Sequence, residues 1–214
     1  MQVLIDNFDT LMRAFGLTLL LVVVAGTLSL IFGTILAGMR VGPVRVLNKA
    51  GAVYVTIFRN NPLLVLLLLV VFGLPKLGIQ MSYFNMNVLA LTLYTSPFIC
   101  EAIRSGVNSI PLGQAEAARS IGLDFTQTMK NVVLPQSFRA VVPPIASVLI
   151  ALTKNTSLVS IFGLTDATSR MKGLLNDNPS QLWWIFLGIA IGYIIIVELI
   201  SAGAALLQRR WRIA

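Results

Sequence analysis

The chain has 214 residues, of which 57% are hydrophobic and 11% are charged, and its formal net charge is +8. A mean hydropathy of +0.86 excludes a soluble domain of ordinary composition and indicates an integral membrane protein. The basic residues lie at the ends of apolar runs rather than on one face, which argues against a nucleic-acid interface. The run LLVLLLLVVF at 63–72 does not alternate, so helices are expected and a β-barrel is not.

Five apolar runs are suited to membrane-spanning helices, which need roughly 20 residues each. The expected spans cover residues 15–39, 53–73, 86–103, 139–153 and 182–207, and together they make one transmembrane domain over 1–214. Residues 46–56 form a partly amphipathic lead-in, and Pro62 opens the longest apolar run, where the first turn of a helix tolerates proline. The fourth run is short, and we expect it to be broken at its start by Pro143 and Pro144 and to be tilted or extended by the polar residues that follow.

Between the third and fourth spans lies a polar, alanine-rich loop over residues 108–135. Within it, the sequence from Gly113 to Pro135 predicts a short helix, a break at Gly122, a second amphipathic piece and a stop at Leu134 and Pro135. Two short helices in an elbow would form a compact knob at the membrane surface, suited to contact with a partner.

The distribution of basic residues predicts the topology. With the N-terminus outside, eleven basic residues fall on the inner side, and the outer side holds only Arg13, Lys76, Lys154, Arg170 and Lys172. The positive-inside rule therefore places the N-terminus outside, and both the loop and the C-terminus in the cytoplasm.

The polar loop carries a recognisable pattern. Glu116, Ala117, Ala118 and Gly122, followed by nine residues and VVLP, resemble the EAA loop of permease subunits in bacterial ABC importers, with Val132 in place of isoleucine. RNNPLL at 59–64 and LTKNTSLVSIFG at 152–163 resemble the polar amino acid branch of that family, which serves histidine, glutamate, glutamine and arginine, and are most similar to the glutamate-uptake permeases.

The resemblance implies an all-α permease subunit of the bacterial inner or plasma membrane whose EAA loop docks on a cytoplasmic ATPase dimer. The implied coupling residues are Gly113, Glu116, Ala117, Ala118, Arg119, Gly122, Leu134 and Pro135. It also implies a second permease subunit, identical or a sister chain, and an extracytoplasmic amino acid-binding protein. The chain has no GxxxxGK[ST] phosphate loop, so we expect no bound cofactor here and ATP on the partner ATPase. Without histidine, and with a single cysteine and dispersed acids, the chain is not expected to be an enzyme or to bind metal.

Polar residues near the spans are candidates for the substrate path. They are Arg59, Asn61, Thr95, Glu101, Asn155, Thr156 and Ser157. Glu101 either lines the path with Thr95 or pairs with Arg104 at helical spacing. Related permeases often have aspartate where this chain has Asn155, which favours an acidic or neutral substrate such as glutamate or glutamine; the alternative for this segment is a helix cap and interface anchor.

Two other functions fit the same composition. An ATP-independent oligomeric channel or ion-coupled carrier for a small polar solute would use Glu101 and Glu198 for charge movement. A scaffolding membrane subunit would need neither a path nor a coupling loop. For Glu198, packing at a subunit interface is the expected role.

Overall fold

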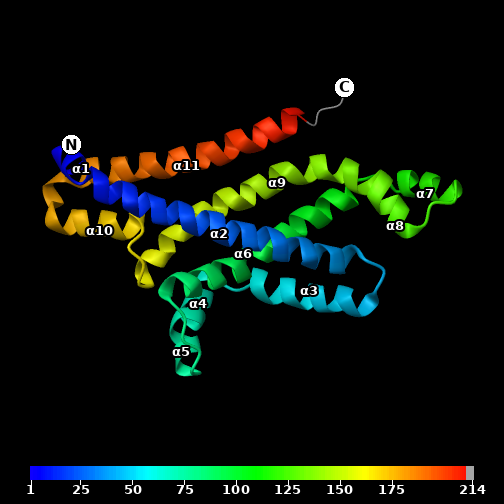
Figure 1. Cartoon of the computed structure of the whole chain (residues 1–214), viewed down its shortest axis with the longest axis horizontal. Helices are drawn as coiled ribbons and strands as arrows, with labels where there is room; N and C mark the ends of the chain where they lie inside the picture. The colour runs from blue at the N-terminus through cyan, green and yellow to red at the C-terminus, as the bar shows by residue number, and fades with distance from the viewer. Residues whose placement is uncertain (211–214) are drawn as a thin grey trace.

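The computed structural model describes residues 1–210, and every regular element in that range is a helix (Figure 1). The α-helices are α1 (Gln2–Asp6), α2 (Phe8–Val41), α3 (Arg45–Arg59), α4 (Leu63–Leu68), α5 (Leu74–Lys76), α6 (Tyr83–Asn108), α7 (Leu112–Ser120), α8 (Phe125–Thr128), α9 (Leu134–Asn155), α10 (Ala167–Asp177) and α11 (Leu182–Arg210). Turns of π-helix at Leu69–Gly73 and Met129–Val133 and of 3-10 helix at Thr156–Ile161 and Pro179–Gln181 join some of them.

Four continuous helical stretches are long and apolar enough to cross a membrane, and the total is five when the bent pair Arg45–Arg59 and Leu63–Lys76 is counted as one span. The stretches are Phe8–Val41, Tyr83–Asn108, Phe125–Ile161 and Pro179–Arg209. The predicted all-helical membrane fold with about five spans is therefore confirmed. In the most apolar 18-residue stretch of α6, 67% is buried inside the chain, whereas only 17% of the corresponding stretch of α11 is buried. α6 therefore forms the centre of the bundle and α11 its margin.

The second span, expected over residues 53–73, consists of two helices, and the second of them starts after Pro62, where the sequence predicted the first turn of a helix. α3 ends at Arg59, α4 begins at Leu63, and the two parts are bent by 97°. Proline has no N–H to donate and disfavours helical geometry in the residue before it, so Pro62, with φ −62° and ψ 136°, ends one helix and starts the next. As a result α4 and α5 project from the side of the bundle (Figure 1).

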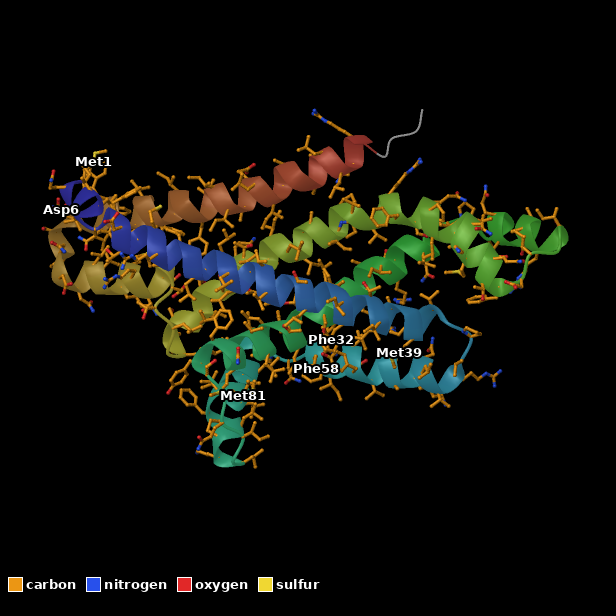
Figure 2. The ribbon with its side chains drawn as sticks, viewed as in Figure 1. Met1, Asp6, Phe32, Met39, Phe58 and Met81 are labelled. Atoms are coloured by element: carbon orange, nitrogen blue, oxygen red, sulfur yellow. The ribbon has the colours of Figure 1, made fainter. Side chains whose placement is uncertain are left out.

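The amphipathic lead-in expected at 46–56 forms most of α3, which lies along the end of α2. Val55 of α3 packs on Leu36 and Ala37 of α2 and on Cys100 of α6. Met39 joins the edge of this cluster and lies on the side of α2 that faces α3 (Figure 2). The buried thiol of Cys100 is thus a small packing residue between three helices.

The prolines near the fourth span do not interrupt it, contrary to expectation. The helix is continuous over Phe125–Ile161, with Pro143 and Pro144 inside α9 and Pro135 in its first turn. A π-helical turn directly precedes Pro135, and another precedes Pro75 in the second span. The wider π-helical turn changes the pattern of backbone hydrogen bonds at the position where proline has no N–H to donate. The helix therefore continues through the proline.

A buried carboxylate fixes α10 at the N-terminal end of the bundle. Asp166, which is fully buried, accepts hydrogen bonds from the backbone N–H of Ser169 (3.0 Å) and Thr168 (3.2 Å). The hydroxyl of Tyr193 on α11 donates to the same carboxylate at 3.4 Å and lies 2.9 Å from the hydroxyl of Thr168. Asp166 is therefore both the N-cap of α10 and its link to α11.

This cap predicts a pH dependence of stability. Burial raises the pKa of Asp166 above its ordinary value, although its hydrogen bonds act in the other direction. The folded protein then binds this proton more tightly than the unfolded chain, so stability falls as pH rises from the ordinary aspartate pKa through the raised one. Asp166→Asn should keep the cap and flatten this slope in thermal unfolding of the detergent-solubilised protein. Asp166→Ala should flatten the slope as well, but its free energy of unfolding should lie about 1 kcal/mol below that of Asp166→Asn at each pH, because the cap is lost. An Asn variant with the wild-type slope would contradict the assignment.

Candidate functional site

The loop between the third and fourth spans forms the expected elbow, at the end of the molecule opposite the N-terminus (Figure 1). α7 ends in a turn in which the N–H of Leu123 donates to the carbonyl of Ala118 (3.2 Å) and the N–H of Gly122 to that of Arg119 (2.9 Å). This is a Schellman motif, and it needs a left-handed residue, which Gly122 supplies with φ +88°. The predicted break at Gly122 is confirmed.

A capping box starts the second arm of the elbow. The carboxylate of Asp124 accepts from the N–H of Gln127 (2.7 Å), and the side chain of Gln127 accepts from the N–H of Asp124 (3.0 Å). The prediction did not include this cap, although an acid followed three residues later by glutamine is a known helix-start pattern. Gly122 and the capping box together set the angle between α7 and α8.

The coupling residues on α7 divide into an outward and an inward group. Gly113, Glu116, Ala117 and Arg119 are exposed. Ala118 is only 4% exposed and packs toward its own chain, so its small side chain lets α7 lie close to the rest of the loop.

Two exposed apolar side chains at the ends of α7 were not among the predicted site residues. Leu112 is 80% exposed and Ile121 is 78% exposed. Their positions directly after Pro111 and directly before Gly122 were visible in the sequence, but their exposure was not, because it depends on which side of α7 packs inward. They add an apolar group at each end of the otherwise polar outward side of α7.

Leu134 and Pro135 lie apart from this outward surface, at the start of α9. Leu134 is 47% exposed and lines a groove between helices. The stop predicted at these two residues is wrong, since the π-helical turn carries the chain directly into the fourth span.

Glu101 is held in an ion-pair cluster that joins two spans. Its carboxylate accepts hydrogen bonds from Arg40 at the end of α2 and from Arg104 on its own helix, the latter at 2.8 and 3.1 Å. The structure therefore favours the ion-pair alternative over a free carboxylate on the substrate path. Arg40 was not predicted as a partner, because the two residues are 61 positions apart in the chain. Among residues 1–210, no group of three His, Cys, Asp or Glu side chains could hold a metal ion.

Two of the predicted path residues, Thr95 and Asn155, line a cavity of about 330 Å³ between α6 and α9. Its lining residues are Tyr94, Thr95, Phe98, Ser147, Val148, Ala151, Leu152 and Asn155. The guanidinium carbon of Arg59 lies 5.8 Å from the ring centre of Phe98, which places a positive charge beside this cavity. The Thr95 hydroxyl is buried without a hydrogen-bond partner among the described residues.

The remaining path residues have local roles in the structure. The Asn61 amide donates to the carbonyl of Ile57 (2.7 Å) at the end of α3. The hydroxyl of Thr156 donates to the carbonyl of Thr153, and that of Ser157 to Lys154, both at 2.7 Å. These last two bonds support the helix-cap alternative for this segment, and they leave Asn155 to line the cavity.

The apolar helical spans, with the polar elbow at one end, define a multi-pass membrane protein. The chain belongs to the family of binding-protein-dependent transport system inner membrane components, which matches residues 29–213.

Relatives of known name match almost the whole chain. The glutamate transport system permease protein GluC of Corynebacterium glutamicum is 37% identical, over 96% of this chain and 95% of its own. The probable glutamine ABC transporter permease protein GlnM of Bacillus subtilis is 35% identical, over 98% and 96%. A chain in the crystal structure of an amino acid ABC transporter with histidines is 27% identical with a TM-score of 0.88, and covers 97% of this chain and 96% of its own.

Proposed function

We propose that this chain is the permease subunit of an ATP-driven importer for a polar amino acid, with glutamate or glutamine as substrate. The relatives named for glutamate and glutamine transport support the substrate class. The positive-inside distribution supports a bacterial inner or plasma membrane location with the elbow in the cytoplasm.

The observation that carries this proposal is the outward surface of α7. Leu112 and Ile121 are largely exposed, and on the cytoplasmic side they would face water rather than lipid. With Glu116, Ala117 and Arg119 between them, they form a docking surface with apolar ends and a polar middle. A cytoplasmic ATPase dimer that receives this surface would hydrolyse ATP itself, and its closure would move the elbow and the spans joined to it.

The cavity between α6 and α9 is the proposed contact point for substrate inside the permease. Arg59 offers a positive charge near it, and Thr95 and Asn155 offer a free hydroxyl and an amide. Such groups suit the carboxylate and amide of glutamate or glutamine. Glu101, neutralised by two arginines, offers little to a transported cation, which weighs against an ion-coupled carrier.

Glu198 supports pairing with a second permease subunit, identical or a sister chain. It is exposed on the apolar span α11 and forms no ion pair with any described residue. A charge facing lipid near the centre of a span costs about 2.5–3.5 kcal/mol on insertion scales. A second permease would cover this residue, and an extracytoplasmic binding protein would deliver the amino acid to the pair.

The cavity predicts which substitution separates glutamate from glutamine. Asn155→Asp should lower glutamate uptake by at least about tenfold while affecting glutamine less, because a like charge nearby costs more than about 1.4 kcal/mol at an effective dielectric of 20. The measurement is uptake of each labelled amino acid by proteoliposomes containing the permease, its ATPase and its binding protein.

Gln80→Glu, on the exposed connection before α6, adds the same charge away from the cavity and is the control. Equal loss of both amino acids in Asn155→Asp, or no loss of either, would contradict the substrate site. Absence of uptake of any polar amino acid by the wild-type complex would contradict the proposed function itself.

A further inference from the structure

A long apolar groove runs between the spans at the end of the bundle that carries the elbow. A cavity of about 660 Å³ and another of about 400 Å³ adjoin there, and both are lined by Thr34, Ile103, Val107 and Leu134. The larger extends between α9 and α11 to Ala146, Gly203 and Leu207. The smaller reaches the elbow and ends among Phe125, Thr126, Met129 and Lys130.

The lining is hydrocarbon along its length and basic at one end. The hydroxyl of Thr34 donates to the carbonyl of Leu30 and that of Ser137 to Val133, both at 2.7 Å, so these two polar groups are already satisfied within their helices. No acidic side chain lines either cavity. Lys130 is exposed and forms no ion pair with any described residue. An occupant would need a long apolar part and a negative charge at one end.

The groove lies beside segments that belong in the bilayer. α9 and α11, which form two of its walls, are the spans with the least burial inside this chain. The apolar walls of the groove belong to the parts of these spans that lie toward the elbow. Lys130 lies on the elbow itself, just before α9 begins. We propose that this groove binds a membrane phospholipid with an anionic headgroup, with an acyl chain between α9 and α11 and its phosphate beside Lys130.

The charge of the lining favours an anionic lipid over an apolar helix of a second permease. An apolar helix would leave Lys130 without a negative partner at the end of the groove, whereas the phosphate of a lipid would pair with it. A flexible acyl chain one methylene wide can follow the groove from α11 to the elbow.

The test uses the complete transporter complex in vesicles containing phosphatidylglycerol with a photoreactive group midway along one acyl chain. After irradiation, label should concentrate on peptides of α9 and α11 that line the groove. Gly203→Leu should reduce this labelling severalfold, because a Cβ at Gly203 meets nothing within 4 Å and the larger side chain would occupy the groove. Lys130→Gln should reduce labelling by phosphatidylglycerol about fivefold, but not by a phosphatidylcholine probe, as expected for one basic residue at an anionic surface.

Matched controls separate the site from general contact with lipid. Ala202→Leu, exposed beside Gly203 but outside the groove, and Lys49→Gln, exposed on α3, should leave the labelling unchanged. Equal labelling of Gly203→Leu and wild type, or equal loss of both probes in Lys130→Gln, would overturn the proposal. Efficient short-range cross-linking between Gly203→Cys residues of two permeases, without lipid labelling, would assign the groove to a second copy instead.

Discussion

Replacing Leu112 and Ile121 together by aspartate is expected to abolish ATP-driven uptake and to leave the permease folded. Both side chains are exposed, so the change removes no packing within the chain. If the two side chains anchor α7 in a groove of the ATPase, each substitution removes about 2 kcal/mol of binding free energy from apolar burial. Each substitution also brings a negative charge into that groove. The combined effect is a loss of ATPase binding of at least about a hundredfold, measured by copurification of the ATPase with the tagged permease and by ATP-dependent uptake.

A matched variant tests whether the position of these residues matters. Leu77, which is 77% exposed in the connection before α6, would lie on the outer side. Leu77→Asp should therefore leave both copurification and uptake near the wild-type level. Normal ATPase copurification by the Leu112→Asp, Ile121→Asp variant would show that α7 is not the docking element.

Gly33→Ala is expected to destabilise the permease by about 1–3 kcal/mol, although it adds only one methyl group. A Cβ at this position would lie 2.6 Å from the Cβ of Ile99 and 2.9 Å from the carbonyl oxygen of Ser96. Both residues are fully buried on α6, and the second contact is with backbone, so neither group can move aside at low cost. The variant should lower the midpoint of thermal unfolding in detergent and the yield of folded protein.

Gly16→Ala is the control on the same helix, where a Cβ would meet nothing within 4 Å. Alanine has a helix propensity about 1 kcal/mol more favourable than glycine, so this variant should be neutral or slightly stabilised. If the two variants unfold at the same temperature, α2 and α6 do not approach as closely at Gly33 as the structure shows.

The number of spans and their helical structure can be predicted from local sequence. The points at which a helix breaks cannot, because they depend on the backbone hydrogen bonds around each proline. Apolar length alone predicts the helices around α2, α6 and α11. Prolines act in both directions here: Pro62 breaks a helix, but Pro135, Pro143 and Pro144 lie within one. Whether a helix absorbs a proline depends on the adjoining turns and on tertiary packing, which composition does not reveal.

The site shows the same division between local and distant information. Gly122 could be assigned to a turn from its place between two helical patterns, and its positive φ confirms this. The inward side of α7 at Ala118 and the pairing of Glu101 with Arg40 depend on contacts between segments distant in the chain. The cavity that joins Thr95 and Asn155 likewise depends on the packing of α6 against α9.

The most direct measurement is uptake of labelled glutamate or glutamine by proteoliposomes that contain the permease and its ATPase, with the binding protein outside and ATP sealed inside. We expect accumulation that requires internal ATP, stops when the ATPase is omitted, and continues when proton and sodium gradients are collapsed. Uptake that persisted without ATP or ATPase and followed an ion gradient would contradict coupling through α7 and identify a carrier instead.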